Sequence, residues 1–526
     1  MDGCVFVNLR KRAIVVLIIA LLIVIMALLY WWNGRSTESG TFSPKEAIVQ
    51  SERVIDEQYD LVVVGTDPEG VMAAVSAARN GLHTLLIDSK NREILGGLFT
   101  LGWLNSLDMN RLPGSQHDYF NKGLFKEWYD QVEGDSFDVT TAAVIFNRMV
   151  KAEKNIDVRM GLHSFEPLVE EIDGKQAVVG VKLIEQDGSE HNVLAPAVID
   201  ATQDADIAAA AGASFTFGRQ DIGDDKLLMA VTPVFKLTNV TPQVWKEIKD
   251  RLNGDDLPGT GANDQSAWGY GEMWDYPSTN PKKLRSRGLN MGRQNDNTVL
   301  INSIQVFGVD PFDPDSREGA YEAARNELPM MLTYIHDNFP ELKGLALGPM
   351  APELYIRETR HLIGEYRLSM IDLLEQRDHW DAIAYGSYPI DIQSTSSAKT
   401  DRGAVVMAPK QYAVPLRTLI PQNVDGLLVV GRSASFDTLA HGSARVVTLG
   451  MATGEAAGAA VKIAIDEKIT LRALSASKPL VKKLQDLLIV QGMDLKSRKV
   501  KQPEYMSHPA YEGLKAAVSM GIALGS

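Results

Sequence analysis

The apolar positions of the chain first fall into a regular order near residue 60. Leu61–Val64 is a continuous aliphatic run, which is typical of a strand buried on both faces of a parallel sheet. Alanines at positions 73, 74, 77 and 78 give the next segment a small-residue helical face, and Gly81 is placed as its left-handed cap. Thr84–Ile87 is a second apolar run. The pattern predicts a β-α-β unit over Tyr59–Asp88.

Helices and strands continue to alternate beyond this unit. The expected elements are a helix over Asp138–Glu153, a strand over Ile156–Met160, a hairpin of Ala177–Glu185 and His191–Leu194 that turns at Asp187-Gly188, and a strand that ends at Asp200. Far along the chain, Leu427–Val430 is again an apolar run, Gly431 follows it as a tight turn, and Thr453–Gly458 lies in a small-residue helix. A strand, a glycine turn and a small-residue helix therefore occur twice.

The region between these two segments has a different pattern. From about residue 215 to 405 the alternation is lost, and aromatic loops such as SAWGYGEMWDYP and a helix over Ser316–Asn338 replace it. The sequence predicts an α/β fold whose parallel sheet is interrupted by an inserted α+β domain and completed by Leu427–Val430.

The N-terminal region predicts a membrane anchor. Ala13–Trp32 is an uninterrupted apolar run of 20 residues, long enough for a bilayer span, and it ends in an aromatic belt. A cleavable signal peptide is the alternative, but its apolar region is usually shorter, about 7–15 residues. Arg10, Lys11 and Arg12 precede the run, so the positive-inside rule places the N-terminus in the cytoplasm and the bulk of the chain outside.

Composition narrows the chemistry. The net charge of −14 argues against nucleic acid as a partner. The single cysteine, Cys4, excludes an internal disulfide and a cysteine-ligated iron–sulfur cluster. The nine histidines show no metal-ligand spacing, so we expect no metal site. Electron transfer would then depend on an organic cofactor.

The turn after the first strand, Gly65-Thr66-Asp67-Pro68-Glu69-Gly70, has the form of a dinucleotide-binding loop. The usual pattern has glycine at the first, third and sixth positions, because the backbone approaches the pyrophosphate there. Asp67 holds the third position and adds bulk and negative charge. Asp88 follows Gly70 by 18 residues, where an acid suits a ribose hydroxyl; otherwise it is a turn residue at the strand end.

Two further stretches offer backbone groups to a cofactor. The pair Gly96-Gly97 presents N–H groups with no side chain in the way, although glycine pairs also form plain turns. The helix around Thr453–Gly458 suits a flavin oxygen near its positive end, or its small residues serve only packing against the sheet.

Five stretches together resemble the FAD-dependent oxidoreductase family of the glutathione-reductase-type flavoproteins, related in layout to p-hydroxybenzoate hydroxylase. They are VVVGTDPEGVMAAVSAARNG, ILGGLFTLG, VIDATQDADIAAAAG, YIRETRHLIGEYRLS and LLVVGRSASFDTLAHGSARVVTLGMATGEAAGAA. The resemblance implies a doubly wound FAD-binding (Rossmann-like) domain with an inserted α+β substrate domain. With the N-terminal transmembrane helix, the expected ranges are 1–35 membrane anchor, 36–55 linker, 56–214 and 406–468 FAD-binding domain, 215–405 substrate domain and 469–526 helical tail.

The resemblance also implies which residues hold FAD. They are Gly65, Gly70, Asp88, Gly97, Thr100, Thr202, Gly431, Arg432, Ser443, Arg445, Gly454 and Ala457. Two positions depart from the family's motifs, because Asp67 replaces the middle glycine and Gln203 replaces the glycine of an ATG motif. Either change fits an altered affinity or a FAD site that has degenerated.

The catalytic candidates are Arg357, Arg360 and His441. An arginine of the RETRH stretch could bind a substrate carboxylate through two N–H groups; the alternative is a structural ion-pair strand. His441 could transfer a proton beside the flavin, or be an ordinary loop histidine.

Two functions fit the sequence. The first is a membrane-anchored FAD oxidoreductase that takes hydride from a small organic substrate at flavin N5 and passes electrons to oxygen, a quinone or a protein. The second is a non-catalytic or redox-neutral protein on a flavin-binding scaffold, which Asp67 and Gln203 favour slightly. We expect no separate NAD(P)H domain, because no second complete GxGxxG is present.

Overall fold

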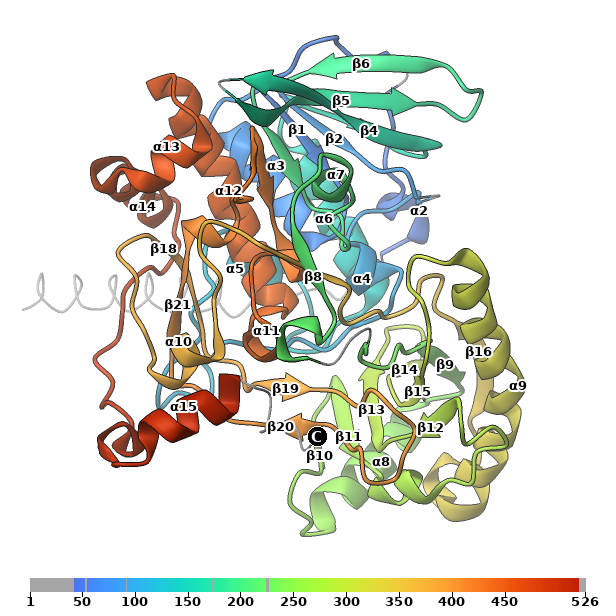
Figure 1. Ribbon diagram of the computed structural model, residues 1–526. Coiled ribbons are helices and arrows are strands. Elements are labelled where there is room, and N and C mark those ends of the chain that lie inside the picture. The colour runs from blue at the N-terminus through green and yellow to red at the C-terminus, as the bar shows by residue number, and fades with distance from the viewer. Residues whose placement is uncertain (1–41, 53, 91, 173, 224–226, 520–526) are drawn as a thin grey trace, which may run out of the picture. The chain divides into compact units, whose positions relative to one another are not determined.

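A five-stranded parallel sheet is the base of the fold in the computed structural model, which describes residues 42–52, 54–90, 92–172, 174–223 and 227–519 (Figure 1). The strand order is β23-β7-β1-β2-β3, and every neighbouring pair is parallel. The strands are β1 (Leu61–Val64), β2 (Thr84–Ile87), β3 (Ile156–Arg159), β7 (Val198–Asp200) and β23 (Leu427–Val429). The late segment of the chain therefore completes the sheet that the early segment begins.

The two faces of this sheet are covered by different layers. Leu61 and Val63 belong to the core that contains helices α3 (Pro68–Arg79) and α12 (Val447–Glu467), whereas Val62 and Val64 belong to the core beneath a second sheet. That sheet consists of β4 (Ser164–Ile172), β5 (Lys175–Ile184), β6 (Glu190–Leu194) and β22 (Val424–Asp425). Successive side chains of a strand point to opposite faces, so a continuous apolar run is buried on both sides.

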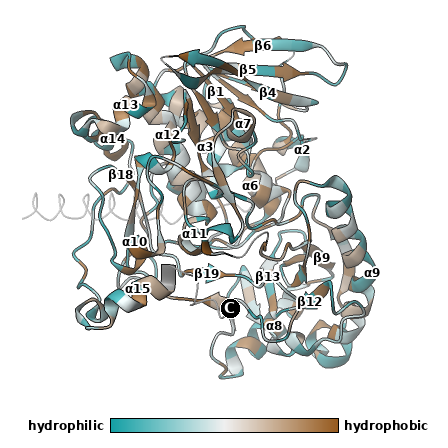
Figure 2. Cartoon of the chain, in the orientation of Figure 1, coloured by the Kyte–Doolittle hydropathy of each residue, from teal (hydrophilic) through white to brown (hydrophobic). Residues whose placement is uncertain are grey.

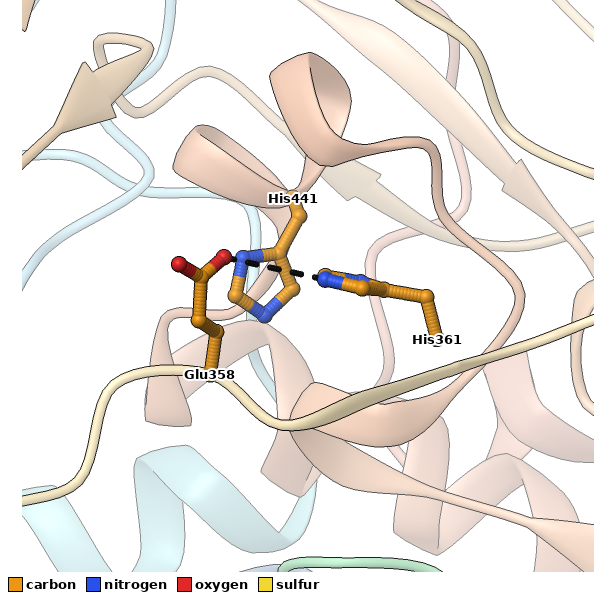
Figure 3. A group of neighbouring side chains, drawn as sticks. All are labelled: Glu358, His361 and His441. Carbon is orange, nitrogen blue, oxygen red and sulfur yellow. Dashed lines mark ion pairs between the residues drawn. The ribbon is translucent and has the colours of Figure 1, made fainter. Parts of the chain in front are cut away.

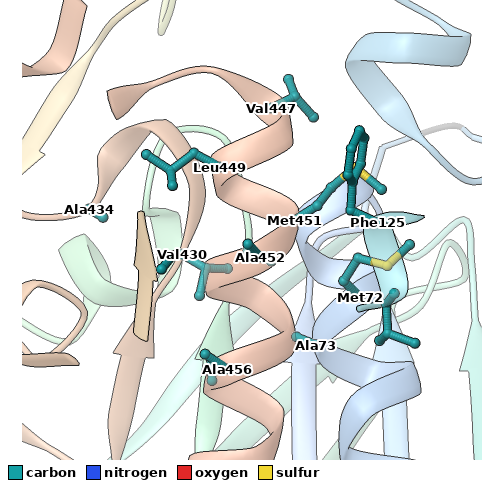
Figure 4. Close-up of a cluster of buried hydrophobic side chains, with 14 of the residues drawn as sticks. Met72, Ala73, Phe125, Val430, Ala434, Val447, Leu449, Met451, Ala452 and Ala456 are labelled. Atoms are coloured by element: carbon teal, nitrogen blue, oxygen red, sulfur yellow. The ribbon is translucent and has the colours of Figure 1, made fainter. Parts of the chain in front are cut away.

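Helices α3 and α12 pack against each other through small residues, among them Ala73, Ala452 and Ala456 (Figure 4). Glycine is required where the backbones approach most closely. A Cβ on Gly454 would overlap the carbonyl oxygen of Glu69, and one on Gly458 would overlap that of Ala73. Both helices are largely apolar, in contrast to the polar outer surface of α9 (Pro314–Asn338) (Figure 2).

Most elements expected from the sequence are confirmed. Strands β1 and β2 have the expected bounds, and Gly81 adopts φ +87° after α3. Helix α6 (Val139–Lys151) begins after Asp138, whose carboxylate accepts the N–H groups of Thr140 and Thr141. Strand β4 was not predicted. Its residues, SFEPLVEEI, are half-buried or exposed and show no regular alternation.

A second core lies between Val231 and Leu354 and forms the insertion. Its antiparallel sheet has the order β10-β11-β13-β14-β9-β16, and helices α8 (Pro242–Gly254) and α9 pack in the same core. These strands are β9 (Phe235–Thr238), β10 (Gly261–Ala262), β11 (Ser266–Gly269), β13 (Leu289–Arg293), β14 (Val299–Ile301) and β16 (Ala346–Met350). Strands β12 (Leu284–Ser286) and β15 (Ile304–Val306) form a separate antiparallel pair. Leu368, Ile383 and Ile390 pack in the first core, so the insertion core is shorter than the expected 215–405.

Short elements connect and flank these two cores. The pairs β8–β17, β18–β21 and β19–β20 are antiparallel. The bounds are α2 (Pro44–Ala47), α4 (Gly97–Thr100), α5 (Leu124–Tyr129), α7 (Asp206–Ala210), β8 (Phe215–Phe217), β17 (Arg360–Leu362), α10 (Met370–Leu374), β18 (Ala382–Gly386), β19 (Asp391–Ile392), β20 (Ala404–Val405), β21 (Tyr412–Pro415), α11 (Thr438–Ala444), α13 (Leu471–Ala476), α14 (Lys478–Val490) and α15 (Tyr511–Ser519).

The expected membrane span, Ala13–Trp32, lies outside the described residues, as does most of the expected linker. In the described part of the chain no single helix is long and apolar enough to cross a membrane. Helices α11 and α12 are long and apolar enough for a membrane span only when taken together, and the chain bends by 89° between them.

Candidate functional site

The turn between β1 and α3 has the backbone geometry of a dinucleotide-binding loop. Gly65 has φ +108°, and a Cβ there would lie 2.5 Å from the carbonyl oxygen of Ala201. A Cβ on Gly70 would overlap the carbonyl oxygen of Gly65. Both glycines are therefore required by close packing of the turn, the helix and the end of β7, as in dinucleotide-binding folds.

Asp67 fills the space that the middle glycine of such a loop leaves open. Its carboxylate lies where a Cβ of Gly97 would be, and it accepts the N–H of Leu98 at 2.8 Å. The backbone N–H next to the glycine pair, that of Leu98, is therefore bound to an anion. The anion in this structure is the chain's own side chain.

Arg92 joins this loop to the inserted region. It contacts Asp67 at 2.8 Å and Asp88 at 3.0 Å, and its Nε and Nη2 each donate to Glu353 at 2.6 Å. Asp88 also accepts the N–H of Thr66 at 3.1 Å. The acid expected to bind a ribose is thus engaged within the chain. We refer to Asp67, Asp88, Arg92 and Glu353 as the Arg92 cluster.

Sequence reasoning missed both Arg92 and Glu353. The only local signal is that Arg92 follows Asp88 by four residues, whereas Glu353 is 261 residues away. Burial alone would raise the pKa of Glu353, but the charges of Arg92 and Lys90 outweigh it and hold the pKa at about 2. The cluster is therefore an ion network at neutral pH.

The second segment meets the first at Gly431 and Arg432. Gly431 has φ +82°, which confirms the expected tight turn. Arg432 donates to the carbonyl oxygens of Gln203 and Ile356 and pairs with Asp204 at 2.6 Å. Its guanidinium is thus held by groups of the chain. Beside it a cavity of about 30 Å³ is lined by Asp67, Glu353, Arg432 and Gln203.

Glu69 is buried next to this junction and is a third residue that the sequence did not reveal. Its carboxylate lies 3.4 Å from the amide nitrogen of Gln203. Burial, with repulsion from Asp67, raises its pKa to about 8. Glu69 is consequently protonated in much of the folded population at pH 7.

Arg357 lies in a buried, arginine-rich pocket. It donates to the carbonyl oxygen of Ala230 at 2.7 Å and to Thr232 at 3.0 Å, and its guanidinium stacks 4.1 Å from the ring centre of Tyr355. Among the described residues no carboxylate lies within 4.0 Å of it. Arg445 donates to the Tyr355 hydroxyl at 3.1 Å. A small cavity of about 10 Å³ is lined by Arg357, Arg445 and Asp108.

The electrostatics of this pocket are unusual. Burial lowers the pKa of Arg357 to about 10, and the charges of Arg287 and Arg445 act in the same direction. Burial raises the pKa of Asp108 and that of Tyr388, whose hydroxyl interacts with Asp108. The pocket therefore combines guanidinium groups with two weakly acidic groups.

The three catalytic candidates do not come together. Arg357 lines the pocket, but Arg360 pairs with Asp206 at 3.0 Å and stacks 4.2 Å from the ring centre of Phe312, which is the structural alternative. His441 is fully buried beside Glu358 and His361 instead of in a loop (Figure 3).

The remaining expected cofactor residues are buried, and most have partners within the chain. Thr100 donates to the carbonyl oxygen of Leu95, Thr202 to Asp200, and Ser443 to the carbonyl oxygen of Tyr388. Ala457 is buried within α12. Gly454 faces the backbone of Glu69, so helix packing accounts for this glycine, and a direct contact with the flavin ring is not needed to explain it.

Comparisons with known proteins place this site in a family. The model of the FAD dependent oxidoreductase family matches residues 60–488. The chain belongs to this family. It is an enzyme family whose cofactor is FAD, and the α/β fold and the resemblance seen in the sequence agree with that assignment.

Several solved structures align with most of this chain at low sequence identity. A geranylgeranyl bacteriochlorophyll reductase-like protein from Thermoplasma acidophilum is 15% identical, with 89% of this chain and 88% of that chain covered and a TM-score of 0.40. A myxobacterial chondrochloren halogenase is 13% identical, with 88% and 91% covered and a TM-score of 0.40. A p-nitrophenol 4-monooxygenase from Pseudomonas putida is 10% identical, with 89% and 97% covered and a TM-score of 0.38. A search of curated proteins found no match.

The backbone of the oxidoreductase fits FAD, but the side chain of Asp67 does not. The glycine turn, the end of β2 and the glycine pair have the arrangement that a dinucleotide needs. The Asp67 carboxylate occupies the Gly97–Leu98 loop, and the cavity beside it measures about 30 Å³. Cofactor pockets are typically about 300–1,000 Å³. FAD binding therefore requires Asp67 to leave the position it has in this structure.

Proposed function

We propose that this oxidoreductase acts on a small organic anion and that Arg357 binds the anionic group. The observation that carries the proposal is a buried guanidinium with no carboxylate within 4.0 Å among the described residues. A buried charge without a partner is costly, and arginine is suited to a carboxylate because its N–H groups form a planar fork. A substrate carboxylate would supply the missing charge.

The surrounding residues support this assignment. Arg445 shares Tyr355 with Arg357, because the hydroxyl of Tyr355 accepts from Arg445 while its ring stacks on Arg357. Tyr355 thereby holds both cations at one pocket. Asp108 interacts with the hydroxyl of Tyr388, and burial raises the pKa of both groups. The Asp108 carboxylate, when ionised, would accept the proton released when a substrate is oxidised.

Bound FAD would supply the hydride acceptor, flavin N5, and electrons would then pass to oxygen, a quinone or a protein partner. The fit of FAD to this chain depends on the position of Asp67.

Anaerobic bleaching of the flavin by a panel of small organic acids tests the proposal. Acids should reduce the flavin, and the matching amides or alcohols should be poor substrates. Arg357→Met should raise KM for the acids about 10- to 100-fold, the value expected for losing a charged hydrogen bond of about 1.5–3 kcal/mol. Flavin content should not change.

Arg360→Met is the matched control, because Arg360 is three residues away and pairs with Asp206 outside the pocket. Arg360→Met should keep KM within about twofold of the wild-type value, because a partly exposed ion pair contributes little energy. Equal effects of the two substitutions, or equal activity on acids and amides, would contradict the role of Arg357.

A non-catalytic role is the second candidate, and the position of Asp67 favours it. A visible spectrum separates the two. Protein purified with added FAD should be yellow if it functions as an oxidoreductase. Colourless protein that binds no FAD at micromolar concentrations would support the non-catalytic alternative.

We also propose that Ala13–Trp32 anchors the oxidoreductase in the cell membrane, with the N-terminus in the cytoplasm. The length of this apolar run and the basic residues before it support the proposal. Protease added to intact cells should digest residues 43–526. Digestion only after lysis would refute the orientation.

A further inference from the structure

Glu358, His361 and His441 come from separate elements and converge at one point (Figure 3). His361 belongs to β17, Glu358 lies just before that strand, and His441 belongs to α11. One nitrogen or oxygen atom of each side chain lies within 4.8 Å of the others. The Nε2 of His361 is 3.7 Å from Oε2 of Glu358, and the two imidazole rings are nearly perpendicular, with centres 4.4 Å apart.

The three side chains are buried, and most of their polar atoms lack partners. Glu358 is 1% exposed, and both histidines are 0% exposed. Within the described residues, Oε2 of Glu358 and all four ring nitrogens have no hydrogen bond of normal geometry. An unsatisfied buried polar group costs about 1–3 kcal/mol, so five such atoms at one place call for an additional partner.

We propose that these three residues bind a divalent transition-metal ion. Two imidazoles and one carboxylate are a common donor set for zinc and for other first-row divalent ions. Two donors that each bind a tetrahedral zinc ion at about 2.0–2.1 Å lie about 3.4 Å from each other. The donor atoms here lie within 4.8 Å of one another, so binding would draw them closer together. Three protein ligands leave the fourth position to water.

The carboxylate is already oriented for this role. Its other oxygen, Oε1, accepts the N–H of Met229 at 2.6 Å, which leaves Oε2 directed toward the histidines. Such outer contacts fix the ligands of metal sites. The nearby cations do not exclude an ion, because Arg432 pairs with Asp204 at 2.6 Å and Arg445 lies 3.5 Å from Asp391.

A metal here would connect β17 to α11 and thereby stabilise the strand next to Arg357. All three ligands are buried away from solvent, so the expected effect of the ion is on stability. The proposal does not rest on the substrate assignment, because metal content is measured without substrate.

Metal content is the test. Full-length protein carrying a tag other than polyhistidine would be purified from medium with added Zn²⁺, dialysed, and analysed by plasma mass spectrometry. We expect about one Zn²⁺ per chain, and at least a tenfold lower content in Glu358→Gln and His441→Gln, since even outer-ligand changes cost about 10–100-fold in affinity. His379→Gln is the matched control. His379 lies 3.5 Å from the carboxylate of Asp372, and within the described part of the chain it belongs to no group of three potential metal ligands.

Thermal unfolding of the wild type gives a second measurement that does not depend on the variants folding. A chelator should lower its melting temperature, and Zn²⁺ should restore it, because a ligand that binds only the folded state stabilises it. Wild type that contains no metal and does not respond to Zn²⁺ would overturn the proposal, and water would then satisfy the cluster. Unchanged zinc content in Glu358→Gln and His441→Gln would overturn it equally.

Discussion

Replacing Arg92 by methionine tests whether the Arg92 cluster is a buried ion network that holds the cofactor loop to the inserted region. The Arg92 side chain is 2% exposed, and those of Asp67 and Asp88 are 3% and 5% exposed. Removing the cation leaves three carboxylates close together, and Lys90, which is half-exposed and 3.7 Å from Glu353, compensates them only in part. Breaking a buried ion pair in this way costs about 3–5 kcal/mol.

Arg79→Met is the matched control for this prediction. Arg79 also binds a carboxylate through two nitrogens, at 2.6 and 2.9 Å from Glu127, but the two side chains are 35% and 41% exposed. An exposed pair of this kind contributes about 0.2–1 kcal/mol. Urea denaturation at pH 7 should therefore show a loss several times larger for Arg92→Met than for Arg79→Met.

The pH dependence supplies a second criterion for Arg92→Met. Glu353 has a folded-state pKa near 2, below its ordinary value of 4.5, so its contribution to stability is present above pH 4.5 and is lost as the pH falls toward 2. The difference between wild type and Arg92→Met should shrink over that range. The ion network would be refuted if Arg92→Met lost no more unfolding free energy than Arg79→Met. It would also be refuted if the difference between wild type and Arg92→Met did not change with pH.

Three further substitutions test the neighbouring residues. Asp67→Gly should raise the affinity of flavin-free protein for FAD at least tenfold in a fluorescence titration, because it frees the Leu98 N–H and removes a negative charge. Asp67→Asn should have a smaller effect. Unchanged affinity in Asp67→Gly would mean that Asp67 does not compete with FAD. Glu69 has a pKa of about 8 in the folded protein and an ordinary pKa of 4.5, so its contribution to stability is full below pH 4.5 and is lost as the pH rises through 8. Glu69→Gln should therefore lower the dependence of the melting temperature on pH between 5 and 8. Parallel curves of melting temperature against pH for wild type and variant would contradict the raised pKa. Gly454→Ala should lower the free energy of unfolding by about 1–3 kcal/mol, because the new methyl group overpacks against Glu69, while FAD affinity is retained. Gly254→Ala, at an open position in α8, should be neutral. A loss of FAD affinity without a loss of stability would instead favour cofactor contact at Gly454.

The parallel sheet and its glycine turns could be predicted because their determinants are local. Apolar runs give β1 and β2 their bounds, and close backbone packing makes Gly65 and Gly70 necessary. The return of Leu427–Val429 to the first sheet followed from the repetition of one pattern at the two ends of the region, whereas its pairing with β7 is seen only in the structure. Strand β4 was missed because its partly exposed residues carry no regular alternation.

The contents of the site were decided by the tertiary structure. Arg92 and Glu353 are 261 residues apart, and His361 and His441 are likewise on distant elements, so no spacing in the chain relates them. In the sequence Asp67 is a departure from the glycine of a loop motif. In the folded chain it contacts Arg92 and accepts the N–H of Leu98. The sequence motif does not distinguish Arg357 from Arg360. In the structure Arg360 pairs with Asp206, whereas Arg357 lacks a carboxylate partner among the described residues. Backbone pattern depends on neighbours along the chain, whereas the charge and burial of a side chain depend on whatever folding packs against it.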